Sequence, residues 1–222
     1  MSTPYLERQP ALDRLPALWT RDFTLLVAGS FIYYVSFQLL LPTMPIYAVR
    51  LGGGTVAAGL TTGCFMAVAI LVRPLAGWAL DVYPRTAVLA LGAAMSAAAI
   101  LAHEFVGGVL LLLLLRAAHG AGFSVTTTAA GTLAADLVPK RRLGEGLVYY
   151  AISMGLPLAI APALGIWLAE GGHFHTLFAI AAACTIVSLL LALPLRAPRL
   201  RPNRRARFCG HAGSPPHSSL RH

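Results

Sequence analysis

Long apolar stretches alternate with short polar links along most of the chain. Six of these stretches are long enough to cross the hydrocarbon core of a bilayer, which takes about 20 helical residues. Because backbone groups in lipid must be hydrogen-bonded within their own segment, each stretch is predicted to be a helix. The predicted spans are residues 23–48, 56–76, 86–102, 106–134, 146–169 and 174–195.

The two ends of the chain lack this apolar pattern. Residues 1–22 form a polar N-terminal segment ahead of the predicted bundle at 23–195. Residues 196–222 form a basic tail that is dense in Arg, Pro, Ser and His and has no periodicity, so we expect it to be disordered. Its arginines suit binding to anionic lipid, whereas its abrupt change of composition favours a truncated or frameshifted end.

Composition supports a membrane protein over a soluble one. The 222 residues are 57% hydrophobic and only 11% charged, whereas soluble domains have about 25% charged residues. The net charge of +9 does not indicate nucleic-acid binding, because the basic residues stand at the ends of apolar stretches and not on a polar face. The sequence contains no nucleophile elbow, no HExxH motif and no Gly-rich phosphate loop. We therefore expect no enzyme, no metal site and no cofactor.

The placement of Lys and Arg predicts the orientation in the membrane. The links on the side of the N-terminus hold Arg85, the run Lys140–Arg142 and the basic tail. The links on the other side carry almost no Lys or Arg apart from Arg50. By the positive-inside rule both termini face the cytoplasm. This predicts a multi-pass protein of the inner (plasma) membrane.

Two of the predicted spans contain residues that could carry chemistry. Arg116 lies inside the fourth span, where a charge is unfavourable and should face the bundle interior or a water-filled cavity. We favour a substrate or proton-coupling site over a structural arginine bonded to backbone carbonyls. His119 is nearly one turn later and can share that face. Gln38 and Tyr34 of the first span are ambiguous, because each suits a cavity wall as well as a contact between helices.

Two stretches of the chain resemble motifs of the major facilitator superfamily. The link after the second span reads G-W-A-L-D-V-Y-P-R and is similar to the family's loop between spans 2 and 3, with Gly77, Asp81 and Arg85 at matching positions. It departs from the family's usual pattern at three other positions of the motif. The fourth span reads R-A-A-H-G-A-G and looks like the family's R-x-x-Q-G-x-G, with His119 in place of Gln.

The fifth span carries a third, looser resemblance. Its Gly155, Pro162 and Gly165 resemble the family's antiporter motif, and they predict a kinked, close-packed helix. The resemblance as a whole covers residues 18–196 and is typical of drug-exporter-like members of the family.

The resemblance implies an all-α integral membrane fold. The family has twelve helices in two halves, each made of two inverted three-helix repeats, and this chain would form the N-terminal half. Arg116 would then be the cavity or proton-relay arginine. Gly77 would permit close helix approach, and Asp81 near the start of the third span would belong with Arg85 to a cytoplasmic latch. Asp136 would be the partner of Arg85.

The function implied by the resemblance is proton-coupled export of a small molecule such as a drug. The sequence holds no second half, so we expect the chain not to transport on its own. One alternative is a half-size transporter that acts as a homodimer or with a second chain. Another is a non-transporting membrane scaffold or regulator that acts through the basic tail. The expected partners are the lipid bilayer, a small-molecule substrate and protons.

Overall fold

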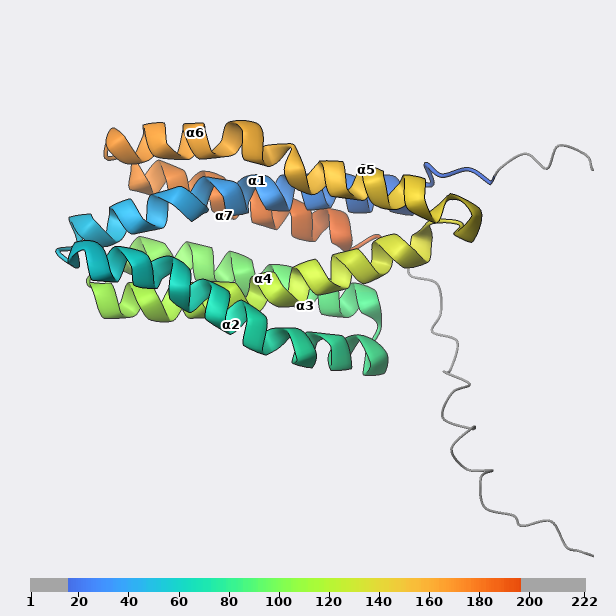
Figure 1. Cartoon of the computed structure of the whole chain (residues 1–222), viewed down its shortest axis with the longest axis horizontal. Coiled ribbons are helices and arrows are strands. Elements are labelled where there is room, and N and C mark those ends of the chain that lie inside the picture. The colour runs from blue at the N-terminus through green and yellow to red at the C-terminus, as the bar shows by residue number, and fades with distance from the viewer. Residues whose placement is uncertain (1–15, 197–222) are drawn as a thin grey trace, which may run out of the picture.

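The computed structural model describes residues 16–196, and the predictions for residues 1–15 and for the basic tail beyond Arg196 lie outside that range. The helices in chain order are α1 (Arg21–Arg50), α2 (Gly54–Val82), α3 (Arg85–Ala102), η1 (His103–Phe105), α4 (Val109–Leu137), η2 (Lys140–Arg142), α5 (Leu143–Gly155), α6 (Pro157–Glu170) and α7 (Phe174–Ala192) (Figure 1). Six helical stretches are long and apolar enough to span a membrane, with α5 and α6 together forming the fifth. The prediction of six spans and an all-α membrane fold is confirmed.

The second helix is longer than the apolar pattern predicted. It continues to Val82, and only Tyr83 and Pro84 separate it from α3. Proline disfavours helical geometry in the residue before it, and Tyr83 is accordingly extended, with φ −109° and ψ 158°. Asp81 therefore lies in the last turn of α2, which corrects the expectation that it stands near the start of the third span.

The fifth span is kinked in its middle. α5 ends at Gly155 and α6 begins at Pro157, with Leu156 between them. Pro157 has no amide hydrogen, so it cannot bond to the carbonyl of Ser153 one turn earlier. Figure 1 shows the two helices meeting at an offset. Leu156 nevertheless keeps helical dihedrals and its amide donates to the carbonyl of Ile152 at 2.9 Å, so α5 and α6 form one span with a kink, as the sequence predicted.

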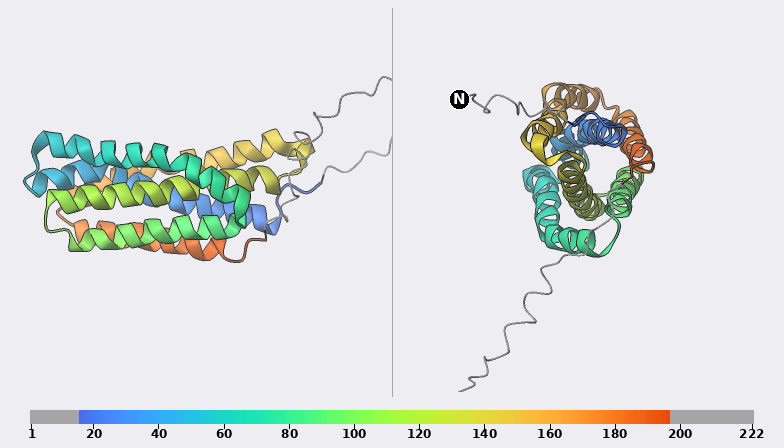
Figure 2. Two further views of the ribbon diagram at one scale, coloured as in Figure 1. Left: turned by 90° about the horizontal axis from the view of Figure 1, so that it is seen from below. Right: turned by 90° about the vertical axis from the view of Figure 1, so that its right-hand side faces the viewer.

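α1 and α4 are the two central helices of the bundle. α2 and α3 pack mainly against α4, whereas α6 and α7 pack mainly against α1. α2 and α3 follow each other in the sequence but hardly touch. The later helices of α1–α3 pack against α4, and the later helices of α4–α7 pack against α1 (Figure 2). This exchange is the packing of two inverted three-helix repeats, α1–α3 and α4–α7.

Glycines in α4 allow its neighbours to approach closely. A Cβ on Gly122 would lie 2.7 Å from the amide nitrogen of Ser96 in α3. A Cβ on Gly120 would collide with the carbonyl oxygen of Phe65 in α2. Small residues bring helix backbones together in lipid, where no hydrophobic effect drives association. The contacts of α4 with α2 and α3 therefore depend on these two positions.

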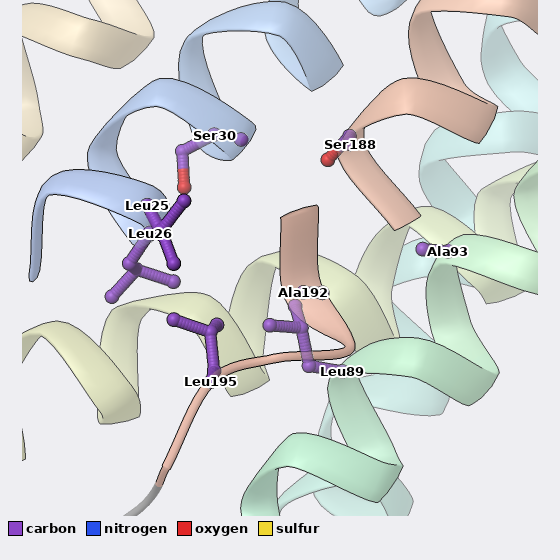
Figure 3. A pocket seen from close by; sticks show the side chains of 9 residues that line it. Leu25, Leu26, Ser30, Leu89, Ala93, Ser188, Ala192 and Leu195 are labelled. Atoms are coloured by element: carbon purple, nitrogen blue, oxygen red, sulfur yellow. The ribbon is translucent and has the colours of Figure 1, made fainter. Parts of the chain in front are cut away.

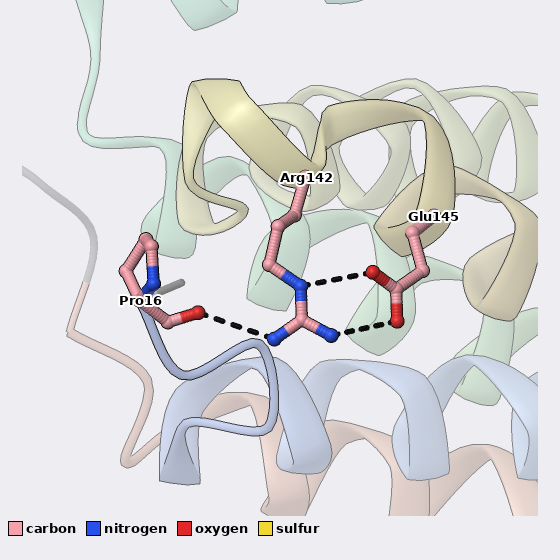
Figure 4. A network of polar contacts seen from close by, with 3 residues as sticks. All are labelled: Pro16, Arg142 and Glu145. Atoms are coloured by element: carbon pink, nitrogen blue, oxygen red, sulfur yellow. Dashed lines mark hydrogen bonds and ion pairs between the residues drawn. The ribbon is translucent and has the colours of Figure 1, made fainter. Parts of the chain in front are cut away.

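Arg142 connects the link between α4 and α5 to the beginning of the described chain. Its guanidinium donates to both carboxylate oxygens of Glu145, at 2.8 and 2.7 Å, and to the carbonyl of Pro16 at 3.2 Å (Figure 4). The hydrogen bonds are exposed, so solvent screens much of the attraction. Their main effect is to position the chain ahead of α1.

Candidate functional site

Arg116 lies in the interior of the bundle, near the beginning of α4. Its side chain has no exposed surface. Its Nε donates to the carbonyl of Thr61 in α2 at 3.2 Å, and its Nη1 donates to Nδ1 of His119 at 3.3 Å. The guanidinium carbon also lies 4.4 Å from the ring centroid of Phe65, within the range of a cation–π contact. The protein itself therefore provides partners for most of this charged group.

His103 joins Arg116 and His119 in one buried group, which we call the Arg116 cluster. It is 1% exposed, its Nδ1 donates to the carbonyl of Ala99 at 2.5 Å, and its ring centroid lies 6.5 Å from that of His119. Its Nε2 and the Nη2 of Arg116 have no hydrogen-bond partner among the described residues. No sequence signal marked His103, because it stands beside Glu104 in a polar link.

Stacked aromatic rings extend from the Arg116 cluster into the middle of the bundle. Phe65 lies 5.2 Å from the His119 ring, and Phe37 lies 5.6 Å from Phe65 and 4.4 Å from Phe123. Tyr34 ends the series, with its ring 6.1 Å from that of Phe123. We call these rings the aromatic layer. Because they are apolar and closely packed, they separate the Arg116 cluster from what lies beyond Tyr34.

Beyond the aromatic layer lies a cavity of about 490 Å³. α1, α2, α4 and α5 all contribute to its walls. The lining residues are Tyr34, Arg73, Thr127, Thr128, Gly131, Thr132, Tyr150 and Met154. Of the four residues predicted for the substrate and proton pathway, only Tyr34 is among them.

Gln38 lies apart from both the cavity lining and the Arg116 cluster. It is buried in α1, and its Oε1 has no hydrogen-bond partner within residues 16–196. It stands one turn before Pro42, which has no amide hydrogen to bond to the Gln38 carbonyl. The structure thus places the four predicted pathway residues at three different locations: the Arg116 cluster, the cavity and this buried position in α1.

Arg73 of α2 is the charged residue of the cavity lining. It is exposed, and no hydrogen bond or ion pair joins it to any other residue of the described chain. It lies nine residues before the end of α2, about 14 Å along the helix axis, and therefore well inside the span. A charge within an apolar stretch marked Arg116 in the sequence. The same signal marks Arg73, but its position next to the polar link concealed it.

Few hydrogen-bond donors in the cavity are free to meet a ligand. The hydroxyls of the three threonines each donate to a carbonyl in the preceding turn of α4, at 2.7 to 2.9 Å. Tyr150 is 5% exposed, and its hydroxyl makes no hydrogen bond of good geometry among the described residues, although Ser30 is a polar neighbour. The free donors are therefore Arg73, Tyr150 and the hydroxyl of Tyr34.

The predicted latch residues lie where α2 ends and α3 begins. Arg85, the first residue of α3, forms an ion pair with Asp136 in the last turn of α4. Asp81 is exposed and has no ion pair within the described range. A Cβ on Gly77 would meet nothing within 4 Å, so the close helix approach expected there does not occur among the described residues. The function of these residues as a latch stays a prediction.

The three residues of the fifth-span motif lie on both sides of the kink. Gly155 ends α5, and a Cβ there would meet open space. Pro162 lies inside α6. A Cβ on Gly165 would lie 2.5 Å from the carbonyl oxygen of Leu39 in α1. Close packing is therefore present at Gly165 and absent at Gly155.

Two other hollows have no charged residue in their linings. One, of about 20 Å³, lies between α1, α3 and α7 (Figure 3) and has room for about one water molecule. The other is an apolar groove of about 500 Å³ on α2 and α3, with Trp78 and Tyr83 in its wall. Of these three hollows, the one at Arg73 is therefore the best candidate for binding a polar solute.

Six helices long enough to span a membrane, packed as two inverted repeats beside a cavity that holds one arginine, have the architecture of one half of a membrane-transporter fold. Residues 26–220 match the Major Facilitator Superfamily, and the chain belongs to that family.

Individual relatives differ in the substrates that their names record. The chain is 25% identical over 183 residues to Multidrug resistance protein 1 of Bacillus subtilis, covering 81% of this chain and 46% of that protein. It is 42% identical over 89 residues to the probable nitrate/nitrite transporter NarK2 of Mycobacterium tuberculosis, covering 39% of this chain and 21% of that protein. A solved peptide transporter, POT, in complex with sulfate shares the fold, with a TM-score of 0.69 and 18% identity over 86% of this chain and 43% of that one. The matched regions cover less than half of each of these proteins.

Proposed function

We propose that the chain is the N-terminal half of a proton-coupled exporter of small molecules, and that its substrate binds in the cavity at Arg73. The observation that carries this proposal is a cavity at membrane depth whose walls come from four helices and whose single charge has no partner within residues 16–196. The multidrug relative supports a small organic substrate, and the nitrate/nitrite relative supports an anion.

The exposure of the cavity supports the proposal that a second six-helix unit covers this face in the complete transporter. An exposed arginine inside a membrane span is unfavourable in lipid, so a second six-helix unit over this face would convert the cavity into an enclosed, water-filled one. Two of the four helices that line the cavity, α2 and α5, also belong to the least buried spans. In their most apolar windows 22% of α2 residues and 28% of α5–α6 residues are buried, against 50% in α1.

The 222-residue chain on its own is therefore expected not to transport. The purified chain would be reconstituted in liposomes with an imposed pH gradient, and uptake of candidate substrates would be measured. Proton-dependent uptake by this chain alone would contradict the proposal. A second test is to read the gene past codon 195 in all three frames. The proposal predicts six further apolar spans in one of these frames.

The Arg116 cluster is the proposed site of proton coupling. His119 and His103 are two rings that can take up and release a proton, and they lie near each other beside the buried guanidinium of Arg116. In the assembly that shows flux, His119→Gln should abolish the dependence of transport on the pH gradient while leaving substrate exchange. His175→Gln, at an exposed histidine, is the matched control and should change neither. Unaltered pH dependence in His119→Gln would exclude this role.

A second arrangement is a homodimer or a complex with a second chain. The apolar groove on α2 and α3 supports it, because a groove of this size favours a packed partner over water. Native mass spectrometry in detergent, with crosslinking in membranes, would show a dimer. A strictly monomeric particle without transport would count against this arrangement.

A further inference from the structure

We propose that the cavity recognises an anionic group of the transported molecule, a carboxylate or another oxyanion, through Arg73, Tyr34 and Tyr150. This inference rests on the proposed function, because it names the chemical class of the substrate that the same cavity would bind.

The first observation is the uncompensated charge of Arg73. The residue lies inside the span, is exposed to the cavity and has no hydrogen-bond or ion-pair partner within residues 16–196. A charge at this depth is stabilised by a counter-charge or by water. The planar guanidinium presents parallel N–H groups that match the two oxygens of a carboxylate. An oxyanion therefore fits this position better than any neutral group.

The second observation is the unpaired hydroxyl of Tyr150. The side chain is 5% exposed and lines the cavity from α5, and its hydroxyl makes no hydrogen bond of good geometry with another described residue, with the Ser30 side chain of α1 as a polar neighbour. Buried hydroxyls nearly always have a partner, and leaving one unpaired is unfavourable. The hydroxyl of Tyr34 is available on α1. Donors on three different helices thus converge on one cavity.

The third observation is that the lining contains no carboxylate. Six Asp and Glu residues fall within the described chain, and none of them lines the cavity. Glu104, Asp136 and Glu145 are already engaged by His175, Arg85 and Arg142 respectively. An organic cation in the cavity would meet the charge of Arg73 without a counter-charge, so the site discriminates by the sign of the ligand's charge.

The rest of the cavity wall suits the apolar part of an organic molecule. Met154, the Tyr34 ring and the unsubstituted surface of Gly131 are apolar, and a volume of about 490 Å³ lies in the range of small-molecule sites. An anionic lipid headgroup offers the same oxyanion chemistry as a soluble carboxylate. We assign the site to the soluble molecule, because the lining comes from the helices that the proposed second half would cover.

The test compares two probes of opposite charge and similar shape, benzoate and benzylamine. The full chain would be placed in phosphatidylcholine nanodiscs, and binding would be measured by equilibrium dialysis with empty nanodiscs subtracted. We expect saturable binding of benzoate and weaker or no binding of benzylamine. Arg73→Gln should raise the Kd for benzoate about tenfold or more, and Tyr150→Phe about two- to tenfold.

Three further variants and conditions separate specific binding from other effects. Arg73→Lys keeps the charge and should retain part of the affinity. Arg50→Gln removes a charge at the end of α1, outside the cavity lining, and should change the Kd by less than about twofold. Nanodiscs with phosphatidylglycerol test the lipid alternative. Gel filtration of every variant confirms that the bundle is folded.

Each contrary outcome has a defined meaning. Absence of saturable benzoate binding, equal binding of benzylamine, or an unchanged Kd in Arg73→Gln overturns the inference. Competitive loss of benzoate binding in phosphatidylglycerol assigns the cavity to a lipid headgroup and also overturns it. Failure of the proposed function is distinct, since it is read from flux. An assembly that exports a cation or a neutral drug contradicts this inference and leaves the proposed transport intact.

Discussion

Two arginines lie inside membrane spans of this chain, and their surroundings are opposite. Arg116 is fully buried, bonded to a backbone carbonyl and a histidine, and covered by the Phe65 ring. Arg73 is exposed in a cavity and has no hydrogen-bond or ion-pair partner among the described residues. α2 and α4 run in the same direction (Figure 1), and the aromatic layer separates the two residues.

The contrast between Arg116 and Arg73 shows that a charge inside a membrane span can be compensated in two ways. A charge at membrane depth has to be compensated. At Arg116 the protein supplies the compensation, so the residue acts on its neighbours. At Arg73 the compensation comes from outside the described chain, so the residue is available to a ligand.

The first prediction compares the loss of each arginine. Arg116→Ala should lower the free energy of unfolding by about 2–4 kcal/mol, because it leaves a cavity and removes the partners of Thr61 and His119. Arg73→Ala should change it by less than about 0.5 kcal/mol. Thermal unfolding in detergent measures both. Arg116→Met, which refills the space, should recover most of the loss. Equal losses at the two arginines would contradict the contrast.

The second prediction compares two glycines on α4, one packed against α2 near the Arg116 cluster and one in the cavity lining. A Cβ on Gly120 collides with the carbonyl of Phe65, so Gly120→Ala should lower the stability by about 1–3 kcal/mol. Gly131 lines the cavity, and a Cβ there meets nothing within 4 Å. Gly131→Ala should therefore be neutral or stabilising by up to about 1 kcal/mol, from helix propensity. A destabilising Gly131→Ala would mean that the cavity is filled.

The third prediction compares two tyrosine hydroxyls. The hydroxyl of Tyr33 is hydrogen-bonded to Ser96 at 2.8 Å, so Tyr33→Phe should cost about 1 kcal/mol of unfolding free energy. The hydroxyl of Tyr150 makes no hydrogen bond of comparable geometry within the described chain, so Tyr150→Phe should be neutral or slightly stabilising in the absence of ligand. The same unfolding assay separates them. A loss at Tyr150 as large as at Tyr33 would show that Tyr150 has a partner within the protein.

The smallest expected effect is at a third arginine, Arg85, whose charge is paired with Asp136. Both side chains are partly exposed, at 22% and 30%, so Asp136→Asn should lower the stability by about 0.2–1 kcal/mol. Exchanging the two charges, with Arg85→Asp and Asp136→Arg together, should restore it. If the exchanged pair remains as unstable as the single variant, the ion pair contributes nothing to this end of the bundle.

Hydropathy was sufficient to predict the six spans, because each helix must satisfy its backbone within one apolar stretch. Hydropathy placed the end of α2 too early. The apolar stretch ends just before Gly77, whereas the helix itself continues to Val82 and is stopped by Pro84. Hydropathy also treated residues 146–169 as one kinked helix. That prediction is correct, because Pro157 removes one hydrogen bond of the span while Leu156 keeps helical dihedrals.

The site was predicted less well than the fold, and the reason is packing. The sequence marks Arg116 and Arg73 by the same signal, but only the arrangement of four helices shows which of them faces the cavity. His103 could not be identified, because burial of a link residue depends on how η1 folds back onto the bundle. Tyr150 had no signal at all, since an unpaired hydroxyl is a property of its surroundings.

The proposed site requires that a water-borne anion can reach the cavity at Arg73, whereas the neighbouring face of α4 is buried. Two threonines on α4 provide matched probes. Thr128 lines the cavity, Thr126 is 3% exposed, and the hydroxyl of each donates to a carbonyl four residues earlier.

The decisive measurement is thiol labelling of Thr128→Cys and Thr126→Cys in a chain whose three native cysteines are replaced by serine. The reagent is methanethiosulfonate ethylsulfonate, which is anionic and does not cross membranes. We expect the cysteine at 128 to be modified and the cysteine at 126 to remain unmodified, and Arg73→Gln should slow the reaction at 128. Equal labelling at both positions, or none at 128, would contradict this expectation.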